Sequence, residues 1–584
     1  MQIQWRGLVL IALSVATAAC GGGGGGGGGS GGNSSSSMTF STSTLEFQAA
    51  SPSSAIPAPQ KISATVSGVK SGTLYVLIQP SGPAIQRVGD LAQTSSTTGE
   101  VTVEVNSPAL LGKGLATSTI TVTACVDDPT CNTRRLRGTP KTITVNYRIG
   151  SPVQVNTIMP AIVSANAPGA AIIRGAGLSD VTGVDIGSVA ATSLQVIDES
   201  EIRVQYPGLP AGSHAVHLRR GTSSTDLSVS VTAVDPAPFA AASWTFPAPS
   251  GFEYEIAELL YDPLTKSLLV AGRAYTTPGM IYDTPSNNVI LRYTYTGSDW
   301  QLSVNRPFPD LRTIALTPDG HTLLAASNDV IERLDPQTLQ TIGSSTKPAA
   351  TDEYALGLAM ANDGNVVVTT GMQPNSGGTR KYLYSLKDYS FALPSFAWPG
   401  AAGVTFYGTP GASADGSMVL VAGAFLNDSV DRYRPGSGKW DLRVLSIYGV
   451  GTGSNRGVPR IDERGSRTLI ADTYIGDVLV LDGNLAQIGR IAGIPDSRAI
   501  TRDGTRVYTI TGRGDLPPCE VHAYDVSTPL ASANDRYPEV TTGGFPFDYS
   551  CVNGFAHLSE MKLSQDERTL FVAGGTGLRV IPLP

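Results

Sequence analysis

The sequence predicts an all-β protein in which two small β-sandwiches are followed by a seven-bladed β-propeller. Period-two alternation of β-branched and polar residues fills the first segment, and turn-rich strands fill the second. A strand-and-turn pattern then recurs seven times to the end of the chain. The 66 glycines and 39 prolines among 584 residues fit a protein built from many short strands joined by turns.

Residues 1–19 are predicted to be a lipoprotein signal peptide. Arg6 is their one charged residue, and the apolar run from Gly7 to Ala19 is shorter than the roughly 20 residues that a membrane-spanning helix needs. The run ends in Thr17-Ala-Ala-Cys20, which resembles a bacterial lipobox, although Leu is usual where Thr17 stands. The resemblance implies lipidation of Cys20, and an ordinary signal-peptidase site after Ala19 is the alternative.

Residues 20–37 are predicted to be a flexible tether. Nine consecutive glycines follow Cys20, and a serine-rich stretch follows them, so this segment cannot bury apolar surface. Residue 21 is Gly and not Asp, which by resemblance to enteric lipoproteins implies anchoring in the outer membrane. We therefore expect an outer membrane lipoprotein of the cell envelope, either periplasmic or surface-exposed.

Residues 38–150 are predicted to form the first sandwich. Segments such as Lys141-Thr-Ile-Thr-Val-Asn-Tyr147 alternate with period two, and turns separate them. Cys125 and Cys131 flank a short loop, and in an exported protein we expect a disulfide between them. A metal site that includes Asp127 and Asp128 is the alternative. The opening segment, Met38 to Phe47, resembles the start of bacterial immunoglobulin-like repeats.

Residues 151–235 resemble an IPT/TIG immunoglobulin-like domain. The resemblance is carried by Pro160, Ile172-Ile-Arg-Gly-Ala-Gly-Leu178, Val184-Asp-Ile-Gly187 and Pro207-Gly-Leu-Pro-Ala-Gly-Ser-His-Ala-Val216. It implies a second immunoglobulin-like β-sandwich that serves as a spacer or a binding module.

Residues 239–584 contain the sevenfold repeat. In each copy an acidic turn precedes a short run rich in Leu, Val and Ala. The turns are Asp262-Pro263, Asp319-Gly320, Asp363-Gly364, Asp415-Gly416, Glu463-Arg-Gly465, Asp503-Gly504 and Asp566-Glu567. Spacings near 40–50 residues between strand-rich units predict one propeller blade per copy. The Asp-Gly pairs are expected to be hairpin turns, because Gly accepts a positive φ.

The repeats resemble the YVTN and WD40-like propellers of bacterial surface and periplasmic proteins. The last copy lacks room for a fourth strand after Leu578 to Leu583, whereas Ala240 to Phe246, before the first copy, has no partner in its own blade. We expect this early segment to supply the outer strand of the seventh blade and to close the ring, which removes open sheet edges.

Loop lengths predict a binding face. The first-to-second and third-to-fourth connections of the blades are short, whereas the second-to-third and blade-to-blade connections are long and are expected to lie together on the other face. The long connections include Arg273 to Asn288, Gly371 to Arg380, Pro399 to Gly411, Tyr448 to Val458 and Tyr537 to His557. Aromatic residues and arginine are favoured contact anchors. The candidate binding residues are Tyr275, Tyr282, Arg380, Tyr407, Tyr448, Arg456, Phe547, Tyr549 and His557. Cys519 and Cys551 lie on two long connections and are expected to form a disulfide.

Little in the sequence indicates chemistry. The formal net charge of −7 argues against nucleic-acid binding. With five histidines and no recognisable catalytic or calcium-binding motif, we expect no metal, no cofactor and no catalytic residue. The favoured function is that of a membrane-anchored, adhesion-type binding protein whose propeller face recognises a protein or a glycan. The alternative is a propeller hydrolase or lyase that acts on an extracellular carbohydrate or lactone, with a catalytic cluster assembled from several blades.

Overall fold

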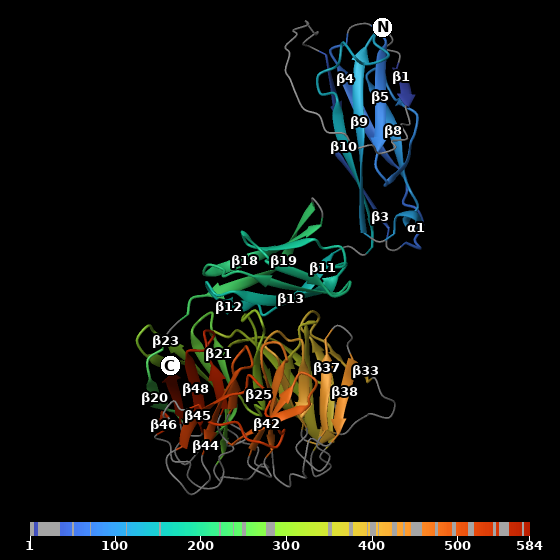
Figure 1. Ribbon diagram of the computed structural model, residues 1–584. Coiled ribbons are helices and arrows are strands. Elements are labelled where there is room, and N and C mark those ends of the chain that lie inside the picture. Colours follow the sequence, from blue (N-terminus) through green and yellow to red (C-terminus); the bar gives the residue numbers. More distant parts are fainter. Residues whose placement is uncertain are drawn as a thin grey trace. The chain divides into compact units, whose positions relative to one another are not determined.

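The computed structural model describes the protein as two compact units (Figure 1). The first comprises Met1–Val153 with Ser179–Val181 and Arg220–Ser223, and the second comprises the rest of the chain. The described residues are 5–9, 36–49, 52–69, 72–112, 114–150, 153–220, 223–236, 239–247, 253–275, 287–348, 353–372, 378–393, 395–396, 405–406, 408–422, 429–435, 439–445, 458–472, 477–492, 498–511, 519–540, 545–547, 560–574 and 577–583. Within these ranges no helix is both long and apolar enough to cross a membrane.

The first unit is a two-sheet sandwich, as predicted. One sheet has the order β1 (Trp5–Val9), β5 (Leu74–Ser81), β9 (Gly114–Val126), β10 (Lys141–Ile149) and β3 (Thr44–Ala49). The other has β2 (Ser37–Phe40), β4 (Gln60–Ser67), β8 (Thr98–Val105) and β6 (Ile85–Val88), with β7 (Ala92–Gln93) paired to β8 and the short helix α1 (Pro108–Leu111) after it. Alternate residues of β8 are buried, which is the packing that period-two sequences predict.

Strand β1 falls within the segment predicted to be the signal peptide. It pairs in parallel with β5 at the edge of the sheet, from Trp5 opposite Leu74 to Val9 opposite Ile78. Processing at Cys20 would therefore remove the outermost strand of this sheet. Cys20 and most of the predicted tether lie outside the described residues.

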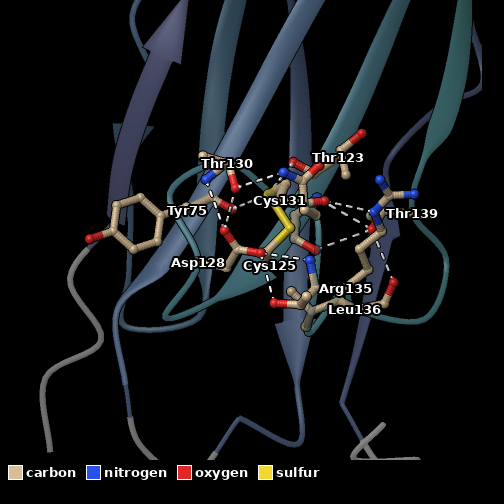
Figure 2. The surroundings of a disulfide bond; sticks show 12 residues. Tyr75, Thr123, Cys125, Asp128, Thr130, Cys131, Arg135, Leu136 and Thr139 are labelled. Carbon is tan, nitrogen blue, oxygen red and sulfur yellow. Dashed lines mark hydrogen bonds between the residues drawn. A yellow bond between two sulfur atoms is a disulfide. The ribbon is translucent and has the colours of Figure 1, made fainter. Parts of the chain in front are cut away.

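The predicted disulfide between Cys125 and Cys131 is present (Figure 2). Cys125 lies in β9, and both cysteines are buried. Asp128 in the intervening loop accepts hydrogen bonds from the backbone and hydroxyl groups of Thr130 and Thr133, at 2.6–3.0 Å. These bonds lower the pKa of Asp128. The loop aspartate holds the turn, so its geometry supports the disulfide interpretation over a metal site.

The second unit begins with another two-sheet sandwich. Its first sheet contains β11 (Gln154–Met159), β13 (Gly169–Ala176), β17 (Glu201–Tyr206) and β16 (Ser193–Val196). Its second sheet contains β12 (Ile162–Ser164), β19 (Ser223–Val234), β18 (Gly212–Arg220), β14 (Gly183–Ile186) and β15 (Val189–Ala190). Ile173, Val184, Ile202 and Leu218 are fully buried between the two sheets.

Seven sheets follow, each built on four antiparallel strands in meander order. Blades 1 to 3 are β21 (Glu253–Asp262), β22 (Ser267–Tyr275), β23 (Val289–Tyr295), β24 (Trp300–Pro307); β25 (Thr313–Leu316), β26 (Leu323–Ala326), β27 (Val330–Leu334), β28 (Thr341–Thr346); and β29 (Glu353–Met360), β30 (Asn365–Met372), β31 (Gly378–Ser385), β32 (Phe391–Ala392). Blades 4 to 6 are β35 (Thr409–Ala412), β36 (Val419–Ala422), β37 (Ser429–Arg434), β38 (Lys439–Leu445); β39 (Arg460–Ile461), β40 (Arg467–Asp472), β41 (Asp477–Asp482), β42 (Gln487–Ala492); and β43 (Arg498–Ile500), β44 (Arg506–Thr511), β45 (Cys519–Asp525), β46 (Phe545–Phe547). Short strands β34 (Thr405–Phe406) and β33 (Ser395–Phe396) add to blades 3 and 4.

The seventh blade closes the ring as the sequence predicts. Its strands β47 (Glu560–Leu563), β48 (Thr569–Gly574) and β49 (Gly577–Pro582) come from the end of the chain, and β20 (Ala242–Thr245) adds the fourth strand by pairing antiparallel with β49. The first strands of successive blades contact one another around the ring, and β47 contacts β21. The predicted seven blades and the predicted closing strand are both confirmed.

The acidic turns between the first and second strands also follow the prediction. Gly320, Gly364, Gly416, Gly465 and Gly504 all have positive φ, between 63° and 86°. The carboxylate of Asp503 accepts hydrogen bonds from Thr501 and Thr505 at 2.7–3.0 Å, which fixes the turn. All seven of these turns lie at one end of the propeller, because each follows the first strand of its blade.

Candidate binding site

The second sandwich covers the turn end of the propeller. The Ser164 hydroxyl donates to the backbone carbonyl of Gln565, and the Gln565 side chain donates to the carbonyl of Ile162, both at 2.9 Å. Gln565 belongs to the turn between β47 and β48. This turn, which the sequence shows only as a hairpin, therefore also contacts the preceding sandwich.

A buried polar cluster holds the same interface near blade 3. Asn362, which is fully buried in the turn between β29 and β30, accepts hydrogen bonds from Thr157 and Arg174 of the sandwich. Arg174 also forms a buried ion pair with Glu201. Asn362 in turn donates to the backbone carbonyl of Asp415 at 3.0 Å, so the cluster reaches the turn of blade 4. Buried polar groups satisfied in this way fix one docking geometry.

The opposite end of the propeller is the one from which the second-to-third connections leave. Of the candidate binding residues, Arg380 is exposed near the start of β31, and Tyr275 and Phe547 are the last residues of β22 and β46. All three lie at or near strand ends opposite the acidic turns. Tyr282, Tyr407, Tyr448, Arg456, Tyr549 and His557 lie outside the described residues, as does Cys551; Cys519 begins β45.

Two of the expected loop boundaries are wrong. Arg380 was expected at the end of a loop but lies within β31, because Gly378 and Thr379 already pair with β30 and β34. The segment from Tyr537 was expected on the long-loop face, but residues up to Val540 connect β45 to β46 at the turn end. Tyr537 is buried and donates to the carbonyl of Thr528 at 3.0 Å, and Arg536 pairs at 2.9 Å with Asp477, the first residue of β41. This connection packs on blade 5.

The propeller axis contains a cavity of about 450 Å³. The segment Met159–Ile162, which joins β11 to β12, lines it together with residues of all seven first strands. Ala315, Leu358 and Gly411 from blades 2, 3 and 4 give it an apolar half. Charged side chains from blades 5, 6, 7 and 1 give it a polar half. The cavity therefore has one apolar wall and one charged wall.

The polar half is lined by charged side chains that include Glu258, Arg460, Arg498 and Lys562. Together with Glu560, which pairs with Arg460 but does not line the cavity, we name them the axial charge cluster. Lys562 pairs with Glu258 at 3.2 Å, and Arg460 pairs with Glu560 across the first strand of blade 6. Arg498 donates to the backbone carbonyl of Val458 at 2.6 Å. Burial raises the pKa of Glu560 to about 7, with Glu258 adding to the rise and Arg460 opposing it.

The cluster fits neither simple expectation for the axis. An uncharged aromatic funnel would have favoured binding alone, and converging carboxylates with histidine would have favoured an enzyme. Instead, each carboxylate pairs with a cation, and His522, which lies in β45, pairs with Glu539 at 2.7 Å. Among the residues described, no three His, Cys, Asp or Glu side chains gather as metal ligands would. The sequence could not show this cluster, because its members are separated by up to about 300 residues and come from four blades.

Residues 152–233 match the family model of the IPT/TIG domain. The second sandwich is an IPT/TIG domain. The predicted resemblance is thereby confirmed, and it is the IPT/TIG domain that covers the turn end of the propeller. No curated protein matches the chain.

Solved structures similar to this chain include several propellers. The WD40 repeats of RRP9 share 13% identity with a TM-score of 0.41, covering 60% of this chain and 99% of that one. The Cps50 (Swd1) propeller domain of Myceliophteria thermophila shares 9% with a TM-score of 0.40, covering 59% and 100%. A Bacteroides thetaiotaomicron protein of unknown function shares 12% with a TM-score of 0.33, covering 74% and 98%. At such values these likenesses carry no argument about activity or partners.

The raised pKa of Glu560 makes stability depend on pH. Because its pKa in the folded protein, about 7, exceeds the ordinary 4.5, the stability that protonated Glu560 contributes is complete below pH 4.5 and is lost as the pH rises through 7. We expect the melting temperature of the wild type to fall relative to that of Glu560→Gln over this range, as measured by thermal melts at a series of pH values. The exposed carboxylate variant Asp310→Asn is the control. Parallel pH profiles for wild type and Glu560→Gln would contradict the prediction.

Proposed function

We propose that this protein is a membrane-anchored binding lipoprotein of the cell envelope that recognises a protein or a glycan with the propeller end opposite the IPT/TIG domain. The observation that carries the proposal is the coverage of the turn end by that domain. Hydrogen bonds from the IPT/TIG domain to Gln565 and Asn362 occupy part of the turn end, which leaves less of it open to a partner. Binding on propellers and other rigid scaffolds is usually carried by connections between strands, and here the second-to-third connections leave from the opposite end.

The anchor of this proposal is Cys20. Its lipidation would place residues 36–584 behind the glycine-rich segment that the sequence predicts to be a tether. We expect labelled palmitate to be incorporated into the wild-type protein and not into Cys20→Ser. Equal labelling of both proteins would remove the anchor from the proposal without touching the binding face.

The binding face is tested by site-specific photo-crosslinking in intact cells. A photoreactive residue is placed at Arg380, at the proposed binding end, or at Lys387, in the turn after β31 at the other end. Both side chains are exposed, and both positions belong to blade 3, so they form a matched pair. We expect a crosslinked envelope protein or glycan from position 380 and none from position 387. Crosslinking from 387 alone would place the partner at the wrong end and overturn the proposal.

A further inference from the structure

Processing at Cys20 would leave one long sheet edge of the first sandwich uncovered. β1 is the end strand of its sheet and pairs with β5 from Leu74 to Ile78 (Figure 1). A chain that begins at residue 20, which we name the processed chain, lacks β1, so β5 becomes the edge strand. This step rests on the processing that the proposed function includes, and it is the same for lipidation of Cys20 and for a signal-peptidase cut after Ala19.

The end strands of this sandwich differ in how well they resist pairing with another chain. β3, at the other end of the same sheet, carries Glu46. β2 and β6, at the ends of the second sheet, are each four residues long, and β6 carries Arg87. Short length and charged side chains both discourage a sheet edge from pairing with a further strand. β5 is eight residues long and contains no charged residue, so in the processed chain its backbone is a template for another strand.

Half of the β5 backbone faces the edge that β1 covers. The Thr73 carbonyl accepts a hydrogen bond at 2.8 Å from the amide of Asp127, just after β9, so residue 73 faces the β9 side. Backbone groups alternate between the two neighbouring strands, and Leu74, Val76 and Ile78 therefore direct their amides and carbonyls to the β1 side. Removal of β1 takes away the strand opposite these groups, and pairing with a new strand satisfies them again.

The side chains of β5 specify which kind of strand fits. Leu74, Val76 and Ile78 are at most 2% exposed, and the residues between them are partly exposed. A strand that pairs beside them places every second side chain next to these core residues, which favours apolar side chains at alternate positions. Pro80 has no amide hydrogen and is the next residue on the β1 side, so the pairing stretch ends near Ile78.

We propose that the β5 edge of the processed chain binds a partner protein through an extended segment with apolar side chains at alternate positions, which adds to the sheet as a parallel strand opposite Leu74–Ile78. The structure seats a strand there in this way, from Trp5 opposite Leu74 to Val9 opposite Ile78. Backbone hydrogen bonds give such a complex its affinity, and the alternate side chains give it selectivity. A two-fold axis perpendicular to the sheet would pair the β5 strands of two copies antiparallel, so the parallel direction favours a partner strand over a second copy.

The test measures binding of a synthetic peptide of residues 4–10, which contains the β1 sequence, to the purified processed chain carrying Cys20→Ser. Calorimetry is expected to detect binding at submillimolar peptide, and hydrogen–deuterium exchange over β5 is expected to slow on binding. The unprocessed chain with the same substitution is the control, because its own tethered β1 competes for the edge and should weaken binding at least about tenfold. No binding at millimolar peptide, or equal binding to both chains, would overturn the proposal. A processed chain that is dimeric and already slow to exchange at β5 would assign the edge to a second copy instead.

Two methylated peptides separate strand addition from other apolar binding. In a parallel pair, a residue that faces its neighbour bonds to the residues on either side of the one directly opposite. Because Val76 lies opposite Gly7, a peptide in this register directs the amide of Leu8 toward β5 and that of Gly7 away from it. N-methylation at Leu8 should therefore weaken binding about tenfold, whereas N-methylation at Gly7 should change it little. Equal effects of the two methyl groups would contradict strand addition.

The outcome can be told apart from that of the proposed function. Mass spectrometry of the exported protein shows whether residues 1–19 are removed, and a chain that keeps them would keep β1 in place and overturn the inference. A processed chain that fails to bind the peptide would leave the lipid anchor and the propeller face as proposed. Equal palmitate labelling of wild type and Cys20→Ser would remove the anchor but leave the β5 edge open, provided that cleavage occurs.

Discussion

Replacing Phe239 with Ala is expected to destabilise the propeller by about 3–5 kcal/mol, the usual cost of removing a large buried aromatic side chain. Phe239 precedes the closing strand β20 and is 3% exposed. Its ring centroid lies 4.9 Å from that of Tyr295, 5.0 Å from that of Trp300 and 5.6 Å from that of Phe571. These partners belong to blades 1 and 7, so the ring fills the seam at which the propeller closes.

Urea denaturation followed by tryptophan fluorescence measures this loss, because four of the five tryptophans lie in the propeller segment. The matched control is Leu393→Ala, since Leu393 is 75% exposed and its removal should change stability by less than about 0.5 kcal/mol. If Phe239→Ala unfolds at the same urea concentration as Leu393→Ala, the closing seam does not stabilise the ring as we infer. A loss of stability in Phe239→Ala that is absent from Leu393→Ala supports closure of the ring by β20.

Removing the carboxylate of Asp431 is the second change with a large expected effect. Asp431 in blade 4 and Lys381 in blade 3 form an ion pair at 2.6 Å, with side-chain exposures of 0% and 1%. The ammonium group of Lys381 also lies 5.2 Å from the ring centroid of Trp440. In Asp431→Ala the buried ammonium loses the carboxylate 2.6 Å away, and we expect a destabilisation of about 3–5 kcal/mol.

The pair is best tested against its own apolar replacement. The double variant Lys381→Met, Asp431→Leu buries no charge, so it should recover most of the stability that Asp431→Ala loses in urea denaturation. The exposed pair of Lys61 and Glu100 supplies the contrast, since Lys61→Ala should cost no more than about 1 kcal/mol. An Asp431→Ala variant as stable as Lys61→Ala would show that this inter-blade ion pair does not stabilise the propeller as we expect.

Some features of this protein could be predicted from its sequence, and others could not. Local patterns predict local structure: the positive-φ glycines of the acidic turns, the alternation in β8 and the disulfide between Cys125 and Cys131 are all confirmed. The closing strand was also predictable, because one repeat lacked a strand and one strand lacked a repeat. None of these predictions requires knowledge of which distant residues contact one another.

The sequence by itself determined the all-β class, the IPT/TIG domain and the seven blades, because each depends on periodicity or on contiguous motifs. The tertiary structure alone decided which propeller end is covered and which side chains meet at the axis. The sequence does not indicate that Arg174 contacts Asn362 or that Arg460 contacts Glu560. Such contacts depend on how separate strands are placed around a ring, and that placement results from packing of the whole propeller and not from any local run of residues.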